Sequence, residues 1–211
     1  MRYFVLGFVC IVGSLLPTAS VLGQSPPAPA VKGRSPDAAA EALHTAQQSH
    51  LWRVGIWGGA NAVGGLALVW ASSRSGRPGR WNFGAMTAGW GIVNVGIAAS
   101  GVITATPPPA EAAAVLDAER QFHNILLFNL GLNVAYSAVG GTMLAAGYRD
   151  VSKAARWRGF GSALVLQGAG LLVLDGIAFF ASRTRLDTLL DPATAVTLQP
   201  LPTGVALTAH F

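Results

Sequence analysis

The chain has 211 residues, of which 52% are hydrophobic and 11% are charged, and its formal net charge is +5. Its mean hydropathy of +0.47 is typical of a membrane protein and excludes an ordinary soluble enzyme of this size. The positive charge does not indicate nucleic-acid binding, because the arginines lie in short segments that flank long apolar runs, where membrane topology accounts for them.

The first 23 residues are typical of a secretory signal peptide. Arg2 precedes an apolar run from Phe4 to Leu16, and residues 21–23 supply the small side chains that a signal peptidase reads. The run has 13 residues, too few to span about 30 Å of hydrocarbon at about 1.5 Å per residue. We therefore expect a cleaved signal, with an uncleaved anchor as the alternative. Cys10 is the only cysteine and lies inside this segment, so we expect no thiol chemistry in the mature protein.

Residues 24–36 are rich in proline, alanine and serine and predict an extended linker. Ser35, Pro36 and Asp37 then form a helix-start signal, with a capping hydroxyl, a proline in the first turn and an acid near the positive end of the helix dipole. We expect the transmembrane domain to occupy residues 37–185.

Four apolar stretches are long enough to cross a bilayer, at residues 51–72, 81–103, 122–147 and 159–181. Together they contain two charged residues, Arg53 near an end and Asp175 in the interior. The pattern predicts an all-α fold, an integral membrane four-helix bundle that follows a cleavable signal peptide and precedes a short extended tail at residues 186–211.

The charged residues between the stretches predict the orientation. The loops after the first and third stretches are basic, and the loop at residues 104–121 is acidic. Basic loops face the cytoplasm, so we expect both termini on the periplasmic side of a bacterial inner membrane. A secreted N-terminus predicts the same arrangement, whereas Arg183 and Arg185 after the last stretch are exceptions to it.

Polar side chains recur near the centre of every predicted span. Spans one and two share the pattern Trp-Gly-x-x-Asn, and the asparagines of the first three spans lie about 15 Å from their outer ends at about 1.5 Å per residue. In span four, a glutamine and an aspartate lie one turn to either side of that level. These residues predict a polar layer at the midplane, formed by Asn61, Asn94, Asn133, Gln167 and Asp175.

Two interpretations of this layer stay open. The amides either hydrogen-bond across helices and fix the register of the bundle, or line a site for a small polar solute or cation, with Asp175 as a relay. We expect Asp175 to pair with Asn or Ser on a neighbouring span. We favour the structural interpretation, because glycines and small residues at four-residue spacing, such as Ala60 and Gly64, let helices approach closely. The predicted packing residues are Trp57, Gly64, Gly65, Trp90, Gly91, Gly141 and Gly168.

His50 and His123 begin the first and third spans, at one level near the outer surface. Two histidines on facing helices could bind haem, and an added carboxylate could complete a metal site. No tight ligand spacing accompanies them, so we favour histidines that bond water and headgroups, and we expect no cofactor. The chain has no Ser/His/Asp set with activating context, phosphate loop or HExxH motif, and we expect no enzymatic activity.

In the tail, residues 205, 207, 209 and 211 are apolar and alternate with their neighbours, which predicts a short strand or hairpin outside the membrane.

Four stretches carry a resemblance to a known family: Ile56–Gly65, Met86–Ile97, Ile125–Tyr136 and Leu166–Asp175. Over roughly residues 45–182 the chain resembles uncharacterised bacterial four-span membrane proteins that share a domain of unknown function. The resemblance implies a four-helix inner-membrane bundle and supplies no activity. Our leading hypothesis is a structural or accessory protein that contacts the lipid bilayer and associates with itself or with a larger membrane complex. The alternatives are a transporter or channel and a haem or metal protein.

Overall fold

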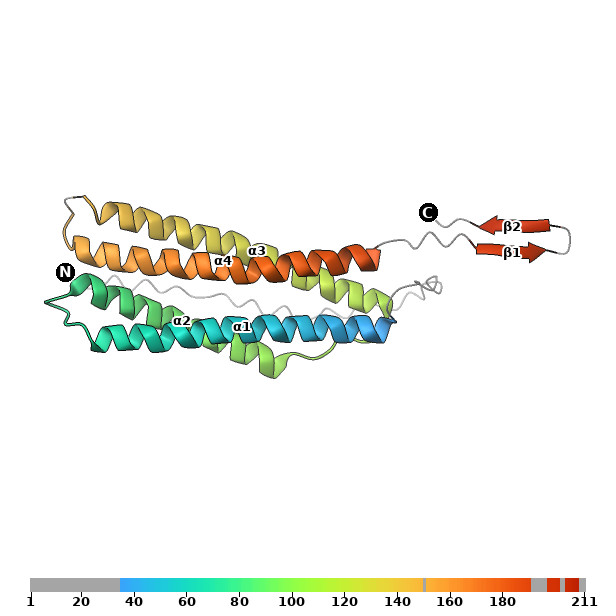
Figure 1. Ribbon diagram of the computed structural model, residues 1–211, viewed down its shortest axis with the longest axis horizontal. Coiled ribbons are helices and arrows are strands. Elements are labelled where there is room, and N and C mark those ends of the chain that lie inside the picture. The colour runs from blue at the N-terminus through green and yellow to red at the C-terminus, as the bar shows by residue number, and fades with distance from the viewer. Residues whose placement is uncertain (1–34, 150, 191–196, 202–203, 209–211) are drawn as a thin grey trace, which may run out of the picture. The chain divides into compact units, whose positions relative to one another are not determined.

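The computed structural model describes residues 35–149, 151–190, 197–201 and 204–208. These residues form the helices α1 (Pro36–Trp70), α2 (Pro78–Thr104), α3 (Ala112–Ala146) and α4 (Ala154–Leu190), followed by the strands β1 (Thr197–Leu201) and β2 (Gly204–Thr208) (Figure 1). The helical domain confirms the predicted all-α fold with four helices. The expected signal peptide and nearly all of the linker, residues 1–34, lie outside the described residues.

Helix α1 begins where the sequence predicted a helix start. Pro36 is its first residue, and the Ser35 hydroxyl accepts a hydrogen bond from the backbone N–H of Ala38 at 3.3 Å. The helices nevertheless extend well beyond the apolar stretches, and α4 continues to Leu190, past the boundary predicted at residue 185. The extensions at the starts of α1 and α3 are rich in alanine, which continues a helix without adding to an apolar run. At the opposite ends, α1 and α3 stop at Trp70 and Ala146, slightly before the predicted limits.

Three of the four helices, α2, α3 and α4, are long and apolar enough to cross a membrane. Helix α1 has the length but does not reach the same apolar composition. Helix α1 contains charged and polar residues, including Arg53 and Asn61, which lower its hydropathy. Composition therefore supports three of the four predicted spans.

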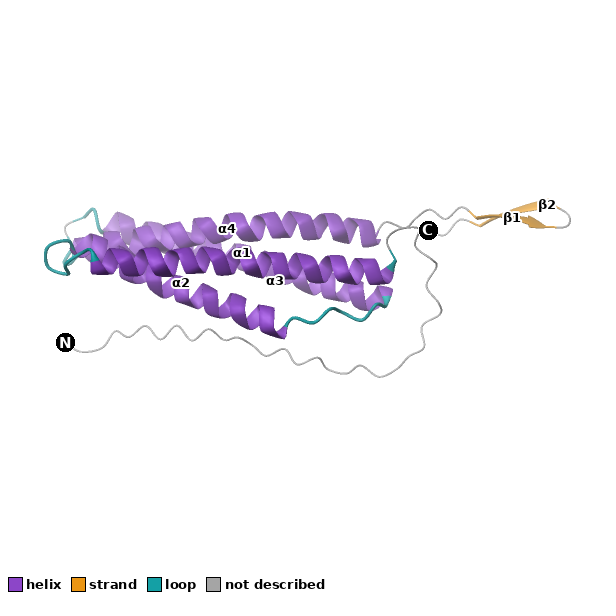
Figure 2. Cartoon of the chain, turned by 60° about the horizontal axis from the view of Figure 1, so that its bottom comes forward, coloured by secondary structure: helices purple, strands orange, loops and turns teal. Residues whose placement is uncertain are grey.

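The helices form two antiparallel hairpins, α1 with α2 and α3 with α4, and α2 also packs against α4 (Figures 1 and 2). In both hairpins, glycines of one helix lie opposite glycines of the other. In the first, Gly58 lies opposite Gly91 and Gly65 lies opposite Gly84; in the second, Gly140 lies opposite Gly161. Backbone atoms meet directly at these positions, so each hairpin is a close-packed unit.

The structure places Gly65, Gly91 and Gly168 in these close contacts. A Cβ added at Gly65 would lie 2.6 Å from the carbonyl oxygen of Gly84, and one at Gly91 would lie 2.6 Å from that of Gly58. A Cβ at Gly168 would lie 2.7 Å from the Asn133 carbonyl oxygen. No side chain fits at such distances without separating the helices.

The small residues predicted at four-residue spacing do not all share this role. A Cβ added at Gly64 or Gly141 meets no atom within 4 Å, and Ala60 is exposed. These residues face away from the neighbouring helices, so they do not contribute to packing inside the chain. In the first hairpin the facing glycines are seven residues apart on each helix, a spacing that brings them to the same helix face at every second turn.

In the tail, β1 and β2 form an antiparallel pair in which Thr197 lies opposite Thr208 and Leu201 lies opposite Gly204. This hairpin lies in the region where the alternating sequence pattern predicted short strands.

Candidate functional site

Helix α4 carries a buried face that contacts all three other helices. Its polar residues Gln167, Asp175 and Ser182 are each less than 5% exposed. Buried polar side chains require partners, and Gln167 Oε1, the Asp175 carboxylate and the Ser182 hydroxyl find them on α1, α2 and α3. The result is three polar clusters, which we name after Gln167, Asp175 and Glu119.

In the Asp175 cluster, residues from three helices meet. Asn133 of α3 donates from Nδ2 to Asp175 Oδ2 at 2.6 Å, and His50 Nε2 of α1 lies 3.1 Å from Asp175 Oδ1. All three residues are buried, with exposed fractions of 3–7%. Both carboxylate oxygens are therefore engaged, which offsets the cost of placing the group inside the bundle.

Asn133 is the kind of partner that the sequence predicted for Asp175, an amide on a neighbouring span. His50 is the partner that sequence reasoning missed. The hydropathy profile placed it at the membrane surface, because the apolar stretch begins at Leu51. Helix α1, however, begins at Pro36, so His50 lies almost four turns inside it and is buried, not in contact with water and headgroups.

The Gln167 cluster also joins three helices. Trp57 of α1 donates from its indole nitrogen to Gln167 Oε1 at 3.2 Å, and Asn94 of α2 donates to the same oxygen at 3.5 Å. The Trp57 ring lies against Gly170, where an added Cβ would be 2.6 Å from Cη2 of the indole. Trp57 therefore combines the expected packing role with an interhelical hydrogen bond. Trp90 contacts the Tyr136 ring instead, at 5.0 Å between centroids.

The predicted single layer is thus divided into two levels. Gln167 and Asp175 are eight residues apart on α4, about 12 Å at about 1.5 Å per residue. Asn61 joins neither cluster, because its Nδ2 donates to the Trp57 carbonyl one turn earlier in α1, at 2.7 Å. Counting residues from the span ends placed Asn61, Asn94 and Asn133 at similar depths, although these side chains face different neighbours.

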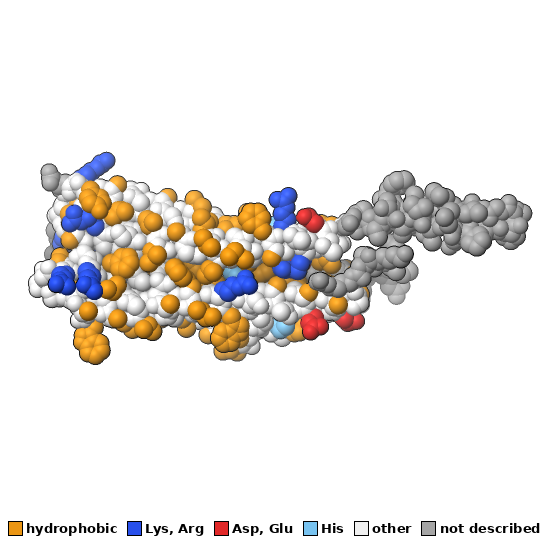
Figure 3. Space-filling model, in the orientation of Figure 1, with side chains coloured by type: hydrophobic (Ala, Val, Ile, Leu, Met, Phe, Trp, Pro, Cys, Tyr) orange, Lys and Arg blue, Asp and Glu red, His pale blue; other side chains and the backbone are white. Residues whose placement is uncertain are grey.

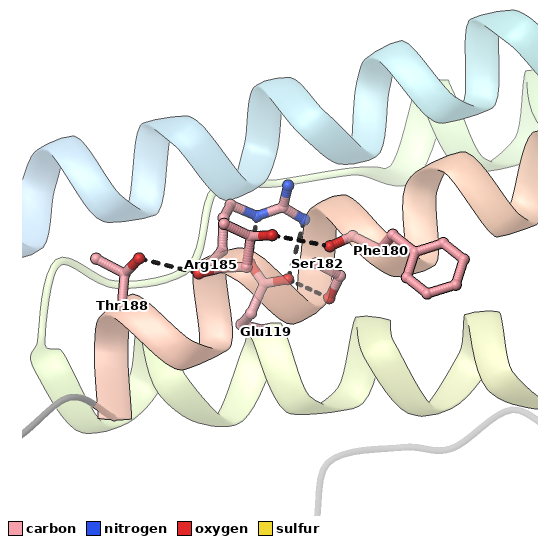
Figure 4. Close-up of polar contacts among 6 residues, drawn as sticks. Glu119, Phe180, Ser182, Arg185 and Thr188 are labelled. Atoms are coloured by element: carbon pink, nitrogen blue, oxygen red, sulfur yellow. Dashed lines mark hydrogen bonds and ion pairs between the residues drawn. The ribbon is translucent and has the colours of Figure 1, made fainter.

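Figure 4 shows the Glu119 cluster, which the sequence did not predict. Glu119 of α3 is 1% exposed, and Arg185 of α4 donates to both of its carboxylate oxygens, from Nε at 2.8 Å and from Nη2 at 2.9 Å. The Ser182 hydroxyl donates to the same carboxylate. The sequence assigned Glu119 to an acidic loop and Arg185 to an exception in the charge pattern. A usable signal was present, since Ser182 and Arg185 share one face of a helix.

Apolar layers separate the three clusters along α4. Ala178 packs with Leu43, Phe122 and Leu126 between the Glu119 and Asp175 clusters. Leu171 packs with Val54, Ala98 and Trp57 between the Asp175 and Gln167 clusters. Within the described helices, each polar cluster is therefore closed by apolar side chains on the side facing the next one.

The two histidines considered for haem or metal make different contacts. His50 faces Asp175, whereas the His123 ring stacks on Phe179 at 4.4 Å between centroids. Among the described residues, no three His, Cys, Asp or Glu side chains lie close enough together to hold a metal ion.

The asparagines provide a matched pair of mutations. We expect Asn133→Leu to lower the free energy of unfolding in mixed micelles by about 1–2 kcal/mol, because it removes an interhelical hydrogen bond to a buried carboxylate. Asn61→Leu should change it by less than about 0.5 kcal/mol, because Asn61 bonds only within its own helix. Equal effects in the two variants would contradict the division of the layer.

Comparison with known proteins places the chain in a family. Residues 53–176 match the model of the DUF6992 family, described as a family of unknown function. This range contains Asn94, Asn133, Gln167 and Asp175, and it ends before Ser182 and Arg185. No curated protein matches the chain, and neither does any solved structure. Since the match covers more than half of the sequence, the chain belongs to the DUF6992 family, a family of unknown function.

Proposed function

We propose that this protein is a small multi-pass membrane protein with a structural or accessory role, which associates with itself or with a larger membrane complex. Its proposed place is a bacterial inner membrane, with both termini on the periplasmic side. The observation that supports the proposal is that apolar side chains separate the three polar clusters from one another. Each cluster joins residues of different helices.

The surface supports the membrane placement. Large apolar side chains are exposed along the helices, for example Ile56 at 69%, Ile103 at 81% and Phe128 at 66%, and Figure 3 shows such side chains over the length of the helical region. Exposed apolar area on this scale is unfavourable in water and is covered by lipid or by a protein partner.

The charges support the orientation. Among the described residues, seven Lys and Arg lie at the end of the helices where the α1–α2 and α3–α4 loops lie, and four lie elsewhere; Figure 3 shows basic side chains toward both ends. Cytoplasmic loops carry such an excess. Arg185, at the other end, is paired with Glu119. Its charge is neutralised locally, so it weighs less against a periplasmic C-terminus than the sequence suggested.

The test is a native mass spectrum of the protein purified from its own membranes in mild detergent. We expect a homo-oligomer or a persistent partner subunit, with no haem or metal mass added. A monomer that carries a bound polar ligand, haem or metal would overturn the structural role and favour one of the alternatives.

A second candidate function is proton or cation transport, favoured by one observation. His50 and Asp175 are two ionisable groups in contact inside the bundle, and intramembrane ionisable groups often mark proton or ion pathways. This candidate requires the apolar layers around Ala178 and Leu171 to open, whereas the structural role requires them to stay closed.

A further inference from the structure

A shallow, largely open groove lies at the basic end of the helices, between α1, α2 and α4. Leu68 of α1 and Phe83 of α2 give it apolar sides, and Gly79 and Gly159 also line it. A Cβ added at Gly159 would lie 2.9 Å from the backbone nitrogen of Phe83, so α2 and α4 are in backbone contact here. The groove is therefore part of a close-packed helix junction.

The polar residues of the groove are cationic or hydrogen-bond donors. Arg80 of α2 and Arg158 of α4 line it together with Ser162. Both arginines are exposed, and neither pairs with a carboxylate among the described residues. Arg77, at the start of α2, provides no side-chain cap, so the positive end of that helix dipole adds to the field of the two guanidinium groups.

The surroundings of the groove increase this positive potential. The two neighbouring loops and helix ends also contain Arg74, Arg77, Arg149, Lys153 and Arg156, against the single acid at position 150. Arg74, Arg156 and Arg158 lie over aromatic rings, of Trp81, Phe160 and Tyr148. Arg80 and Arg158 are the two arginines that line the groove.

We propose that this groove binds an anionic phospholipid of the leaflet on the loop side. Arg80 and Arg158 contact the headgroup phosphate, and an acyl chain lies along Leu68 and Phe83. Arginine suits this role because its planar guanidinium group binds phosphate with two parallel hydrogen bonds. A phospholipid fits better than a free phosphate, because only the lipid also covers apolar side chains. This inference rests on the membrane placement proposed above, not on the accessory role.

The test is lipid binding to the delipidated full chain in mild detergent, followed by native mass spectrometry. Phosphatidylglycerol and phosphatidylcholine with the same acyl chains are the probes. The groove variant is R80Q/R158Q. The control variant, R149Q/R156Q, removes the same charge from the same end of the molecule but not from the groove. Circular dichroism checks that both variants keep their helical content.

We expect the wild type to bind phosphatidylglycerol more tightly than phosphatidylcholine. The groove variant should bind phosphatidylglycerol about thirtyfold more weakly, at about 1 kcal/mol for each arginine removed, and the control variant should bind like the wild type. Equal losses in the two variants would overturn the proposal in favour of non-specific attraction to a basic end. Equal binding of both lipids would overturn recognition of the anionic headgroup.

Competition experiments separate the lipid from a soluble phosphate ligand and from a protein partner. Displacement of the lipid by glycerol 3-phosphate at matched concentration would overturn the proposal in favour of a soluble phosphate ligand. Capture of an acidic protein segment that the lipid does not displace would overturn it in favour of a protein interface. A chain that stays soluble without detergent would contradict the membrane placement itself, whereas a detergent-dependent chain that binds no anionic lipid would contradict only the lipid site.

Discussion

Replacing Arg185 with glutamine should destabilise the folded protein by about 3 kcal/mol, because it leaves the Glu119 carboxylate buried without its cation. Glu119 is 1% exposed and receives two hydrogen bonds from Arg185. The value lies at the lower end of the usual range because the Arg185 side chain keeps 20% exposure. Unfolding in mixed micelles, followed by circular dichroism, measures the change.

Arg183 is the matched control for this experiment. It lies two residues away on α4, is exposed, and has no carboxylate partner among the described residues. Arg183→Gln removes the same charge from the same helix end and should change the free energy of unfolding by less than about 0.5 kcal/mol. A loss of similar size in both variants would show that net charge, and not the Glu119 contact, determines stability.

Adding one methyl group at Gly91 should also be strongly destabilising. In Gly91→Ala the new Cβ would lie 2.6 Å from the Gly58 carbonyl oxygen and 2.8 Å from the Ala62 Cα. Since both atoms belong to the backbone, α1 and α2 must separate. We expect a loss of about 2–3 kcal/mol in the free energy of unfolding, measured in the same micelle assay.

Gly89→Ala on the same helix should have the opposite sign. A Cβ at Gly89 meets no atom within 4 Å, so the substitution should stabilise the helix by up to about 1 kcal/mol through propensity alone. A stabilising effect at both positions would contradict the close packing of the first hairpin.

Much of the helical domain was predictable from hydropathy. Apolar runs separated by short basic or acidic segments located all four helices, and the capping signal at Ser35 gave the start of α1. The ends were less predictable, because alanine-rich extensions such as residues 112–118 remain helical without being part of an apolar run. Hydropathy also treated α1 as equivalent to the other helices, although charged and polar residues such as Arg53 and Asn61 make its composition less apolar.

The candidate site was predictable only in part. The sequence identified Asp175 and an amide partner, and it identified Gln167 and Asn94 as buried polar residues. It did not identify His50 as the second partner of Asp175. This pairing depends on how α1 and α4 are aligned along their axes, and the predicted limits of the spans do not determine that alignment. It also gave Asn61 the same role as Asn133, although rotation about the helix axis directs only Asn133 toward α4.

The Glu119 cluster shows the same limit for charged residues. When membrane topology is predicted from loop charges, a charged residue between two apolar runs, such as Glu119, is counted as exposed. In the structure α3 continues through that segment, so Glu119 lies on the face that packs against α4 and meets Arg185 there. Charge counts alone therefore overstate the exposed charge at this end.

In the proposed structural role, the Asp175 cluster holds helices together behind closed apolar layers and does not conduct protons. The most direct test of this role is proton flux into liposomes that contain the folded wild-type protein, driven by a pH gradient and compared with empty liposomes and with the Asp175→Asn variant. The structural account predicts that all three preparations leak at the same rate. Rapid flux through the wild type that Asp175→Asn abolishes would contradict it and establish His50 and Asp175 as a proton pathway.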